Sequence, residues 1–196
     1  MFDQIELVGE FFERLTAIDE AITARVAAAA CAFCGGPLHR GDYPRKPRGG
    51  LVAVAAEAFS RRFSLCCGRE GCRRRATPPS VRFLGRRVYV GAVVIVASIV
   101  ALATMTASAI RRATGISPRT ARRWLRWWRG PFSETRVFAA LSARLVPAVS
   151  REELPASVLA RVPGSAETKL AYLLGWLAPL TTASVRDGSR FVRGLG

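Results

Sequence analysis

The sequence predicts a mainly α-helical fold with one small β-structured segment. Apolar residues recur every three or four positions over long stretches before and after residues 31–80, which is the spacing of amphipathic helices. Residues 31–80 differ because they contain prolines, glycine pairs and all five cysteines, a composition typical of loops and short strands. With 196 residues, half of them apolar, the chain has material for one compact domain or two small ones. A large multidomain enzyme and a globally disordered chain are both excluded.

The charge of the chain is concentrated in its middle. Thirty basic residues against fourteen acidic ones give a net charge of +16. Residues 40–129 contain twenty basic and three acidic residues, whereas residues 1–30 contain two basic and six acidic ones. A positive segment of this kind favours polyanions, either nucleic acid or an anionic membrane surface.

Residues 2–30 are expected to form one amphipathic helix that packs on the body of the protein. A dimerisation helix is the alternative, but the segment contains few complete heptads. No uninterrupted apolar run precedes Arg14, so we expect no secretory signal and a cytoplasmic, nucleoid-associated protein. In a reducing compartment the cysteines are expected to bind metal rather than to form disulfides. The apolar stripe of the helix consists of Ile5, Val8, Phe12, Leu15, Ile18, Ile22 and Val26.

The cysteines form two groups with the spacing of a zinc ribbon. Cys31 and Cys34 are separated by two residues and followed by two glycines, and Cys67 and Cys72 are separated by four residues. Cys66 is the alternative to Cys67, which we prefer because strand alternation from residues 63–65 places it on their face. We expect one structural Zn²⁺ per chain, because nothing nearby supplies the open position and general base of a catalytic zinc. Reduced, buried cysteines without metal are the alternative.

The surroundings of this site are expected to be loops with a basic surface. The only histidine, His39, is expected to be a loop residue, because four cysteines already complete a tetrahedral site. Residues 51–59 are expected to form a short helix. The candidates for phosphate contact are Arg40, Arg45, Lys46, Arg48, Arg61, Arg62, Arg69, Arg73, Arg74, Arg75 and Arg82.

Residues 88–110 contain no charged side chain and admit two interpretations. At 1.5 Å per residue this run is long enough to cross a hydrocarbon layer of about 30 Å. A single span, however, would place the cysteine segment and the arginine-rich segment that follows on opposite sides of a membrane. Arginine pairs also flank the run on both sides, so no charge asymmetry sets an orientation. We therefore expect a buried core helix, broken near residues 104–106, and no membrane partner.

Residues 113–125 predict a helix-turn-helix. Gly115 can end one helix in the left-handed conformation, Ser117 can cap the next, and Pro118 suits the first helical position. On a helical wheel Ala121, Trp124, Leu125 and Trp128 share one face, and the opposite face is basic. A solvated helix hairpin is the alternative to a recognition helix. The residues expected to contact DNA are Arg119, Thr120, Arg122, Arg123 and Arg126, together with Arg73, Arg74 and Arg75.

These motifs and their order resemble the zinc-ribbon and helix-turn-helix proteins encoded with bacterial insertion sequences. In chain order the segments that carry the resemblance are CAFCGGPLHRGDYPRKPRGG, FSLCCGREGCRRRATPPSVRFLGRRVY and ATGISPRTARRWLRWWRGPF. The resemblance covers residues 31–132 and implies binding to the ends of a mobile element. The RNase H-like core of such transposases is missing here, so the resemblance implies a DNA-binding accessory protein or an incomplete relative. Catalysis would then be left to a separate transposase chain.

The C-terminal third predicts a small helical bundle. Ser133 is expected to cap a helix, and residues 155–162 and 167–177 are expected to form two more. The last of these is apolar nearly all round, so it packs either on the chain's own core or on a second copy in a homodimer. Residues after 186 are expected to form a flexible tail.

Together these segments predict five parts and one function. The parts are an N-terminal helix (1–30), a zinc ribbon (31–85), a helix-turn-helix region (86–131), a C-terminal helical segment (132–185) and a flexible tail (186–196). We expect a sequence-specific binder of double-stranded DNA and not an enzyme, because no recognisable nucleophile or carboxylate pair is present. A chromosomal transcription regulator is the first alternative, and a single-span membrane protein is the second.

Overall fold

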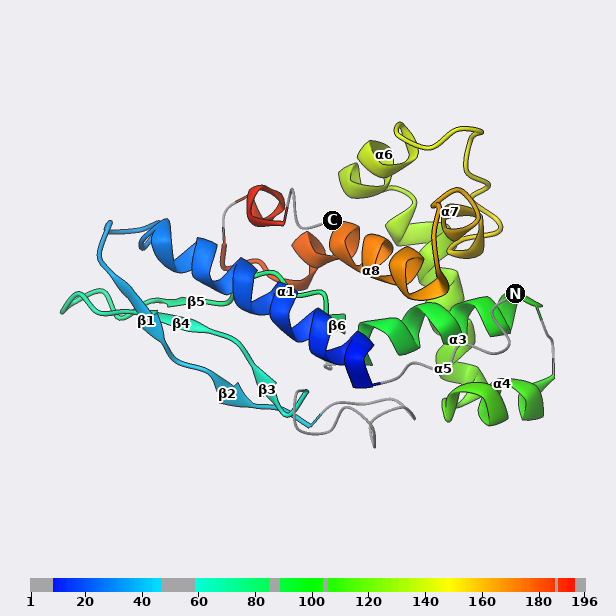
Figure 1. The fold of residues 1–196 in the computed structure, drawn as a ribbon, viewed down its shortest axis with the longest axis horizontal. Coiled ribbons are helices and arrows are strands. Elements are labelled where there is room, and N and C mark those ends of the chain that lie inside the picture. The colour runs from blue at the N-terminus through cyan, green and yellow to red at the C-terminus, as the bar shows by residue number, and fades with distance from the viewer. Residues whose placement is uncertain (1–8, 47–58, 85–88, 104–105, 186, 193–196) are drawn as a thin grey trace.

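The computed structural model describes residues 9–46, 59–84, 89–103, 106–185 and 187–192 (Figure 1). Helices dominate it and the strands are short, which confirms the expected mainly α-helical fold with small antiparallel sheets. The α-helices are α1 (Gly9–Ala28), α3 (Gly91–Ala103), α4 (Ala107–Thr114), α5 (Pro118–Trp127), α6 (Arg136–Ser142), α7 (Ala156–Leu159) and α8 (Ala166–Leu177). Three short helices of other types are η1 (Trp128–Phe132), η2 (Ala178–Thr181) and η3 (Gly188–Phe191).

The strands form a long bent ribbon and a separate two-stranded pair. In the ribbon β1 pairs with β4 and β2 pairs with β3, both antiparallel, and β5 adds to the other edge of β4. Asp42 bridges the bend, because its carboxylate accepts a hydrogen bond from the backbone N–H of Ser64 at 2.9 Å. The strands are β1 (Leu38–Arg40), β2 (Tyr43–Pro44), β3 (Arg61–Arg62), β4 (Leu65–Cys67), β5 (Arg75–Ala76), β6 (Phe83–Leu84) and β7 (Tyr89–Val90). The helix expected at residues 51–59 lies outside the described residues apart from Phe59.

Helix α1 packs on the body of the protein, as its apolar stripe predicts. Phe12, Leu15, Ile22 and Val26 are buried and Ile18 is partly buried, while Ile5 and Val8 lie outside the described residues. The ring of Phe12 meets that of Phe59 edge to face at 5.3 Å, which ties α1 to the chain that enters β3.

A buried ion pair lies under α1 and corrects part of the expected phosphate-binding surface. Asp19 and Arg82 are both 0% exposed, and the Arg82 Nε donates to the Asp19 carboxylate at 2.8 Å. The same carboxylate accepts hydrogen bonds from the Ser80 hydroxyl at 2.5 Å and the Val81 backbone N–H at 2.7 Å. Arg62 is also buried and donates to the Pro78 carbonyl oxygen at 2.6 Å. Arg82 and Arg62 therefore cannot contact phosphate in this fold, and the prediction was wrong for both.

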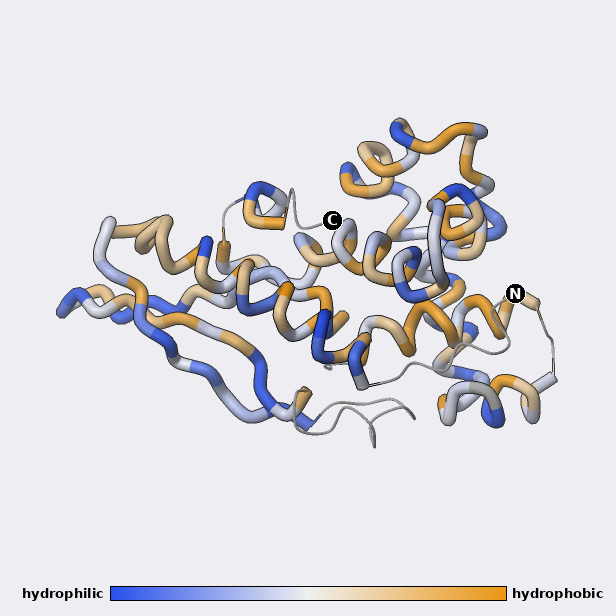
Figure 2. The backbone as a smooth tube through the Cα atoms, viewed as in Figure 1, coloured by the Kyte–Doolittle hydropathy of each residue, from blue (hydrophilic) through white to orange (hydrophobic). Residues whose placement is uncertain are grey.

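Helix α3 is the centre of the helical half. Every residue from Gly91 to Ala101 is buried, because α3 packs against α4, α5 and α8. Figure 2 shows hydrophobic residues along α3 and hydrophilic residues along β2 and β3. The Ser98 hydroxyl is satisfied inside this core, since it donates to the Val94 carbonyl at 2.7 Å and accepts from the Trp128 indole N–H at 3.0 Å.

Only part of the uncharged run of residues 88–110 is the expected core helix, because its described part begins with strand β7 at Tyr89–Val90 and continues as the buried helix α3. Helix α3 ends at Ala103 and α4 begins at Ala107. Thirteen residues of α3 extend about 20 Å, short of the roughly 30 Å hydrocarbon layer. Among the described residues, no helix has the length and apolar character needed to span a membrane.

The turn between α4 and α5 has the local geometry that its residues predict. Gly115 adopts φ +64° and its N–H bonds to the Arg111 carbonyl, which ends α4. The Ser117 hydroxyl accepts the Thr120 backbone N–H, and Pro118 occupies the first turn of α5. Ala121, Trp124, Leu125 and Trp128 are buried, as the helical wheel predicts.

The first helix of the C-terminal segment is capped by a different residue from the one expected. Thr135 caps α6 by accepting the Phe138 N–H at 3.0 Å, whereas the Ser133 hydroxyl donates to the carbonyls of Arg129 and Gly130 within the π-helical turn η1. The apolar helix α8 packs against α3, α6 and α7 of the same chain. In the described part of the expected tail, residues 188–191 form η3, in which the ring of Phe191 is buried.

Candidate metal centre

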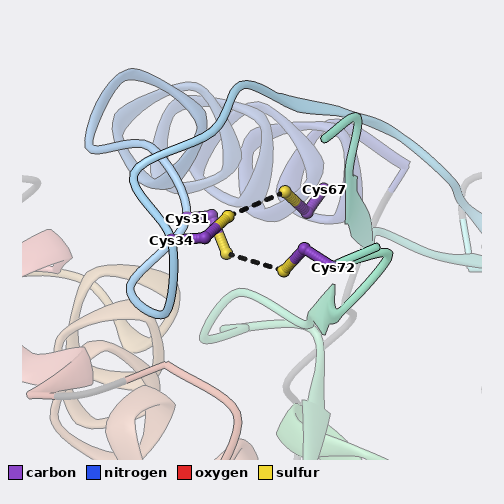
Figure 3. A group of neighbouring side chains, drawn as sticks. All are labelled: Cys31, Cys34, Cys67 and Cys72. Atoms are coloured by element: carbon purple, nitrogen blue, oxygen red, sulfur yellow. Dashed lines mark hydrogen bonds between the residues drawn. The ribbon is translucent and has the colours of Figure 1, made fainter. Parts of the chain in front are cut away.

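Four cysteines from two separate loops bring their sulfur atoms together. The Sγ atoms of Cys31, Cys34, Cys67 and Cys72 all lie within 4.8 Å of one another (Figure 3). The Cys34 and Cys67 sulfurs are 3.4 Å apart, and the Cys31 and Cys72 sulfurs are 3.9 Å apart. Four thiolates around one ion at metal–sulfur distances of about 2.3 Å would be about 3.8 Å apart in a tetrahedron. The group therefore has the size and the donor set to hold one metal ion.

The first loop, residues 31–36, is shaped by its own backbone and by two glycines. The Cys31 N–H bonds to the Gly36 carbonyl at 2.9 Å, and the Gly35 N–H bonds to the Cys31 carbonyl at 2.8 Å. Gly35 has φ +69°, a conformation that side chains disfavour. At Gly36 a Cβ would lie 3.1 Å from the Cys67 sulfur and 3.3 Å from that of Cys34. A side chain at Gly36 would thus crowd two of the four sulfurs.

The second loop, residues 67–72, continues the antiparallel sheet and is braced onto the first. Cys67 pairs with Leu38 in the β1–β4 register, and the Cys72 N–H bonds to the Arg69 carbonyl at 3.1 Å. The Arg69 guanidinium donates to the Cys34 carbonyl at 2.7 Å, which links the two loops directly. This contact gives Arg69 a structural function in addition to its expected phosphate contact.

The protonation preferences of the thiols are unequal. Backbone N–H groups of Phe33 and Cys34 lower the pKa of Cys31 to about 7. At Cys67 the Arg69 N–H opposes the shift, but burial and the neighbouring thiols raise the pKa to about 12. The pKa of Cys72 is also raised, because the Cys34 thiol and burial outweigh the Arg74 N–H. Four thiolates so close together therefore need a bound cation to be ionised at the same time.

The structure separates Cys66 and His39 from this group. Cys67 and Leu65 are buried on one face of β4, as strand alternation predicts, while Cys66 points to the other face. The Cys66 thiol donates to the Arg73 carbonyl, with sulfur and oxygen 3.4 Å apart. His39 lies on strand β1 rather than in a loop, opposite Cys66, and its imidazole covers Gly68.

The residues expected to contact DNA form two exposed groups that lie apart from each other. Helix α5 lies in the helical half of the molecule, and the turn between β4 and β5 lies at the far end of the strand-containing half (Figure 1). On α5 the four arginines are exposed and Thr120, whose backbone takes part in the cap, is half-buried. Arg75 is exposed but donates to the Gly41 carbonyl at 3.0 Å, so it also braces the ribbon.

Sequence reasoning missed the ion pairs that Arg40 makes with Glu20 of α1 and with Asp42. Glu20 and Asp42 both bind Arg40, with Nη1 to Glu20 Oε2 at 2.6 Å and Nε to Asp42 Oδ2 at 2.8 Å. These carboxylates raise the pKa of Arg40. The concentration of acids in residues 1–30, opposite a basic ribbon, was the signal that could have indicated such pairs. Arg48 lies outside the described residues.

Comparisons with protein-family models, with curated proteins and with solved structures gave no match to this chain. What the protein can do therefore follows from its own geometry: a closed group of four thiols, and two exposed basic groups at a distance from each other.

Proposed function

We propose that the protein binds double-stranded DNA with sequence specificity, that α5 is its recognition helix, and that the four cysteines hold one structural Zn²⁺. The observation that carries the proposal is the exposed arginine face of α5, which follows a three-residue turn and lies opposite a fully packed face. Helices that read the major groove in this way use residues of their first turns.

The arginine face is unfavourable for the helix by itself. Arg119, Arg122, Arg123 and Arg126 form like-charged pairs three and four residues apart, each costing about 0.2–0.5 kcal/mol, and α5 contains no acidic residue. Arg119 also lies in the first turn, where the helix dipole disfavours a cation by about 0.3–1 kcal/mol. An anionic ligand would relieve both costs. Phosphates and the acceptor groups of guanine are such ligands, and arginine matches their geometry with two parallel hydrogen bonds.

Zinc is the metal that the donor set favours. Four cysteine ligands in a tetrahedral arrangement are typical of structural zinc sites, whereas a catalytic zinc keeps one position open for water. A Cys₄ site also accounts for the local architecture, because strands of two or three residues bury little apolar area and gain cohesion from the ion. The metal would fix the ribbon, and with it the arginines at 73–75.

The resemblance of residues 31–132 to proteins of insertion sequences supports a mobile element as the biological setting. Within the described ranges, groups of three or more potential metal ligands comprise the four cysteines and no carboxylate cluster. The proposal therefore assigns strand cleavage to a separate transposase chain, and DNA binding to this one.

Selection from a random duplex library tests the proposal and identifies the target sequence in the same experiment. The wild-type protein is expected to enrich one motif. Arg122→Ala and Arg123→Ala should each weaken binding to that motif by about 1–3 kcal/mol and affect random duplex less. Arg136→Ala, which removes an exposed arginine from α6, is the matched control and should change little. Equal losses on selected and random duplex would contradict the assignment of α5.

A further inference from the structure

A pocket of about 240 Å³ lies beside the candidate metal site and shares one of its cysteines, Cys31, as a lining residue. It opens between the end of α1, the 31–36 loop, strand β5 and the C-terminal η3 segment. Val26, Leu38 and Val185 contribute apolar walls, while Phe33, Arg74 and Arg190 also line it. The volume is below the 300–1,000 Å³ or so that is usual for drug-sized ligands, and therefore suits one small ring system.

An exposed aromatic ring stands at this pocket. Phe33 is 54% exposed, whereas every other phenylalanine that the structure describes is buried. The guanidinium of Arg74 lies over the Phe33 ring, with 4.1 Å between Cζ and the ring centroid. Because the ring lines the pocket and about half of it is exposed, it is accessible to a ligand that enters the pocket. A flat ligand can stack on the ring, and the guanidinium next to it can pair with an anion.

A second arginine and aromatic pair, Arg190 and Phe191, also lines the pocket. The Arg190 guanidinium lies 4.5 Å from the centroid of the Phe191 ring, and Phe191 itself is buried. The pocket thus combines an apolar floor, an accessible aromatic ring and two cationic side chains. Single-stranded nucleic acid is recognised by this combination, because each base presents a flat π-face and each phosphate a negative charge.

We propose that this pocket binds one unpaired nucleotide of a DNA strand, with the base stacked on Phe33 and the flanking phosphates paired with Arg74 and Arg190. The inference deepens the proposed function, on which it rests. Base pairs within a duplex are stacked on one another and cannot enter such a pocket. The end of the molecule that carries the four cysteines would therefore detect a frayed or single-stranded DNA end, while α5 in the helical half reads the duplex.

Fluorescence anisotropy with three DNA probes tests the pocket. The probes are a blunt duplex, the same duplex with a short single-stranded extension, and that duplex with an abasic extension of equal length. For the wild-type protein the extension with bases is expected to tighten binding about tenfold, which corresponds to the stacking of one base. The abasic extension keeps the phosphates and should give a much smaller gain.

Variants then locate the effect. Phe33→Ala should abolish the gain from the extension, and Phe33→Trp should restore it, while both keep the metal content and melting temperature of the wild type because the ring is exposed. Leu180→Ala, which removes another exposed hydrophobic side chain, is the control and should keep the gain. A full gain in Phe33→Ala, or equal gains from the abasic and the base-containing extension, would overturn the proposal.

The two proposals can fail separately. Arg122→Ala should weaken binding to the blunt duplex and leave the ratio between extended and blunt probes unchanged. If the wild type binds the blunt duplex but shows no gain from the extension, the pocket assignment is wrong and duplex binding stands. If it binds only the probe with the unpaired bases, the pocket assignment stands and α5 is not a recognition helix.

Discussion

Replacement of Asp19 by alanine should be among the most destabilising single changes on the surface of α1 that faces the core. Its carboxylate is 0% exposed and accepts hydrogen bonds from three groups, the Ser80 hydroxyl, the Val81 N–H and the Arg82 Nε. Arg82 is also 0% exposed, and its guanidinium lies 4.0 Å from the centroid of the Phe63 ring. The Asp19→Ala variant keeps this buried positive charge and removes its carboxylate partner.

The expected loss of stability follows from that burial. Removing one partner of a buried, hydrogen-bonded ion pair costs about 3–5 kcal/mol, because the remaining charge stays desolvated. Small domains are stable by only about 5–15 kcal/mol, so the variant should lose a large share of its free energy of unfolding. For a chain of this size, about 2–4 °C per kcal/mol predicts a fall in melting temperature of roughly 6–20 °C.

Thermal and urea unfolding followed by circular dichroism measure this loss, and the neighbouring residue supplies the control. Glu20 also pairs with an arginine, Arg40, but its side chain is 48% exposed, so Glu20→Ala should cost no more than about 1 kcal/mol. A double variant, Asp19→Leu with Arg82→Met, should recover most of the stability, because it removes both charges of the pair together. If Asp19→Ala is as stable as Glu20→Ala, burial of the pair does not set the cost of breaking it.

Three further predictions concern the metal and DNA. Cys34→Ser should lose the bound metal and cooperative unfolding, whereas Cys66→Ser should keep both, because the Cys66 thiol lies on the other face of β4. Metal analysis measures the first effect and calorimetry the second. Retention of metal in Cys34→Ser would contradict the assigned site. Metal affinity should rise with pH through the neutral range, because protons compete with the metal for the thiolates. Cys31, with its pKa lowered to about 7, loses its proton first as the pH rises. Cys67, with its pKa raised to about 12, ionises only when the metal replaces its proton. Chelator competition at several pH values measures this, and an affinity independent of pH between 6 and 8 or so would refute it. Finally, the logarithm of the DNA-binding constant should fall with the logarithm of salt concentration with a slope between about −4 and −8, and a flat response would exclude association led by phosphate contacts.

The local features of the fold could be predicted because short-range physics decides them. Gly115, Ser117 and Pro118 fix the end of one helix and the start of the next through backbone preferences and a cap that need no distant contact. The burial of Trp124 and Leu125 on one face of α5 follows from helical periodicity. The spacing of the cysteines likewise indicates the two loops, since each loop is closed by its own backbone hydrogen bonds.

The buried charges could not be predicted, because a sequence assigns charged residues to the surface by default. In the sequence, Arg62 and Arg82 cannot be distinguished from the exposed Arg61 and Arg75, because all four lie in the same basic segment. Only the packing of α1 against residues 78–84 places Asp19 next to Arg82, so that each charge compensates the burial of the other. The same holds for the caps of the C-terminal segment, where the π-helical turn η1 shifts the start of α6 from Ser133 to Thr135.

The sequence by itself determined the mainly helical class, the break in the uncharged run, the turn before α5 and the two cysteine loops, all of which depend on residues close together in the chain. The spacing of the cysteines also indicated which four sulfurs meet, whereas the tertiary structure alone decided how close those sulfurs lie, which arginines enter the core and where the basic groups lie. Cys34 and Cys67 are 33 residues apart, and their sulfurs lie 3.4 Å from each other. The physical reason is that such proximity depends on how the strands and α1 pack together, and backbone preferences do not encode packing over that distance.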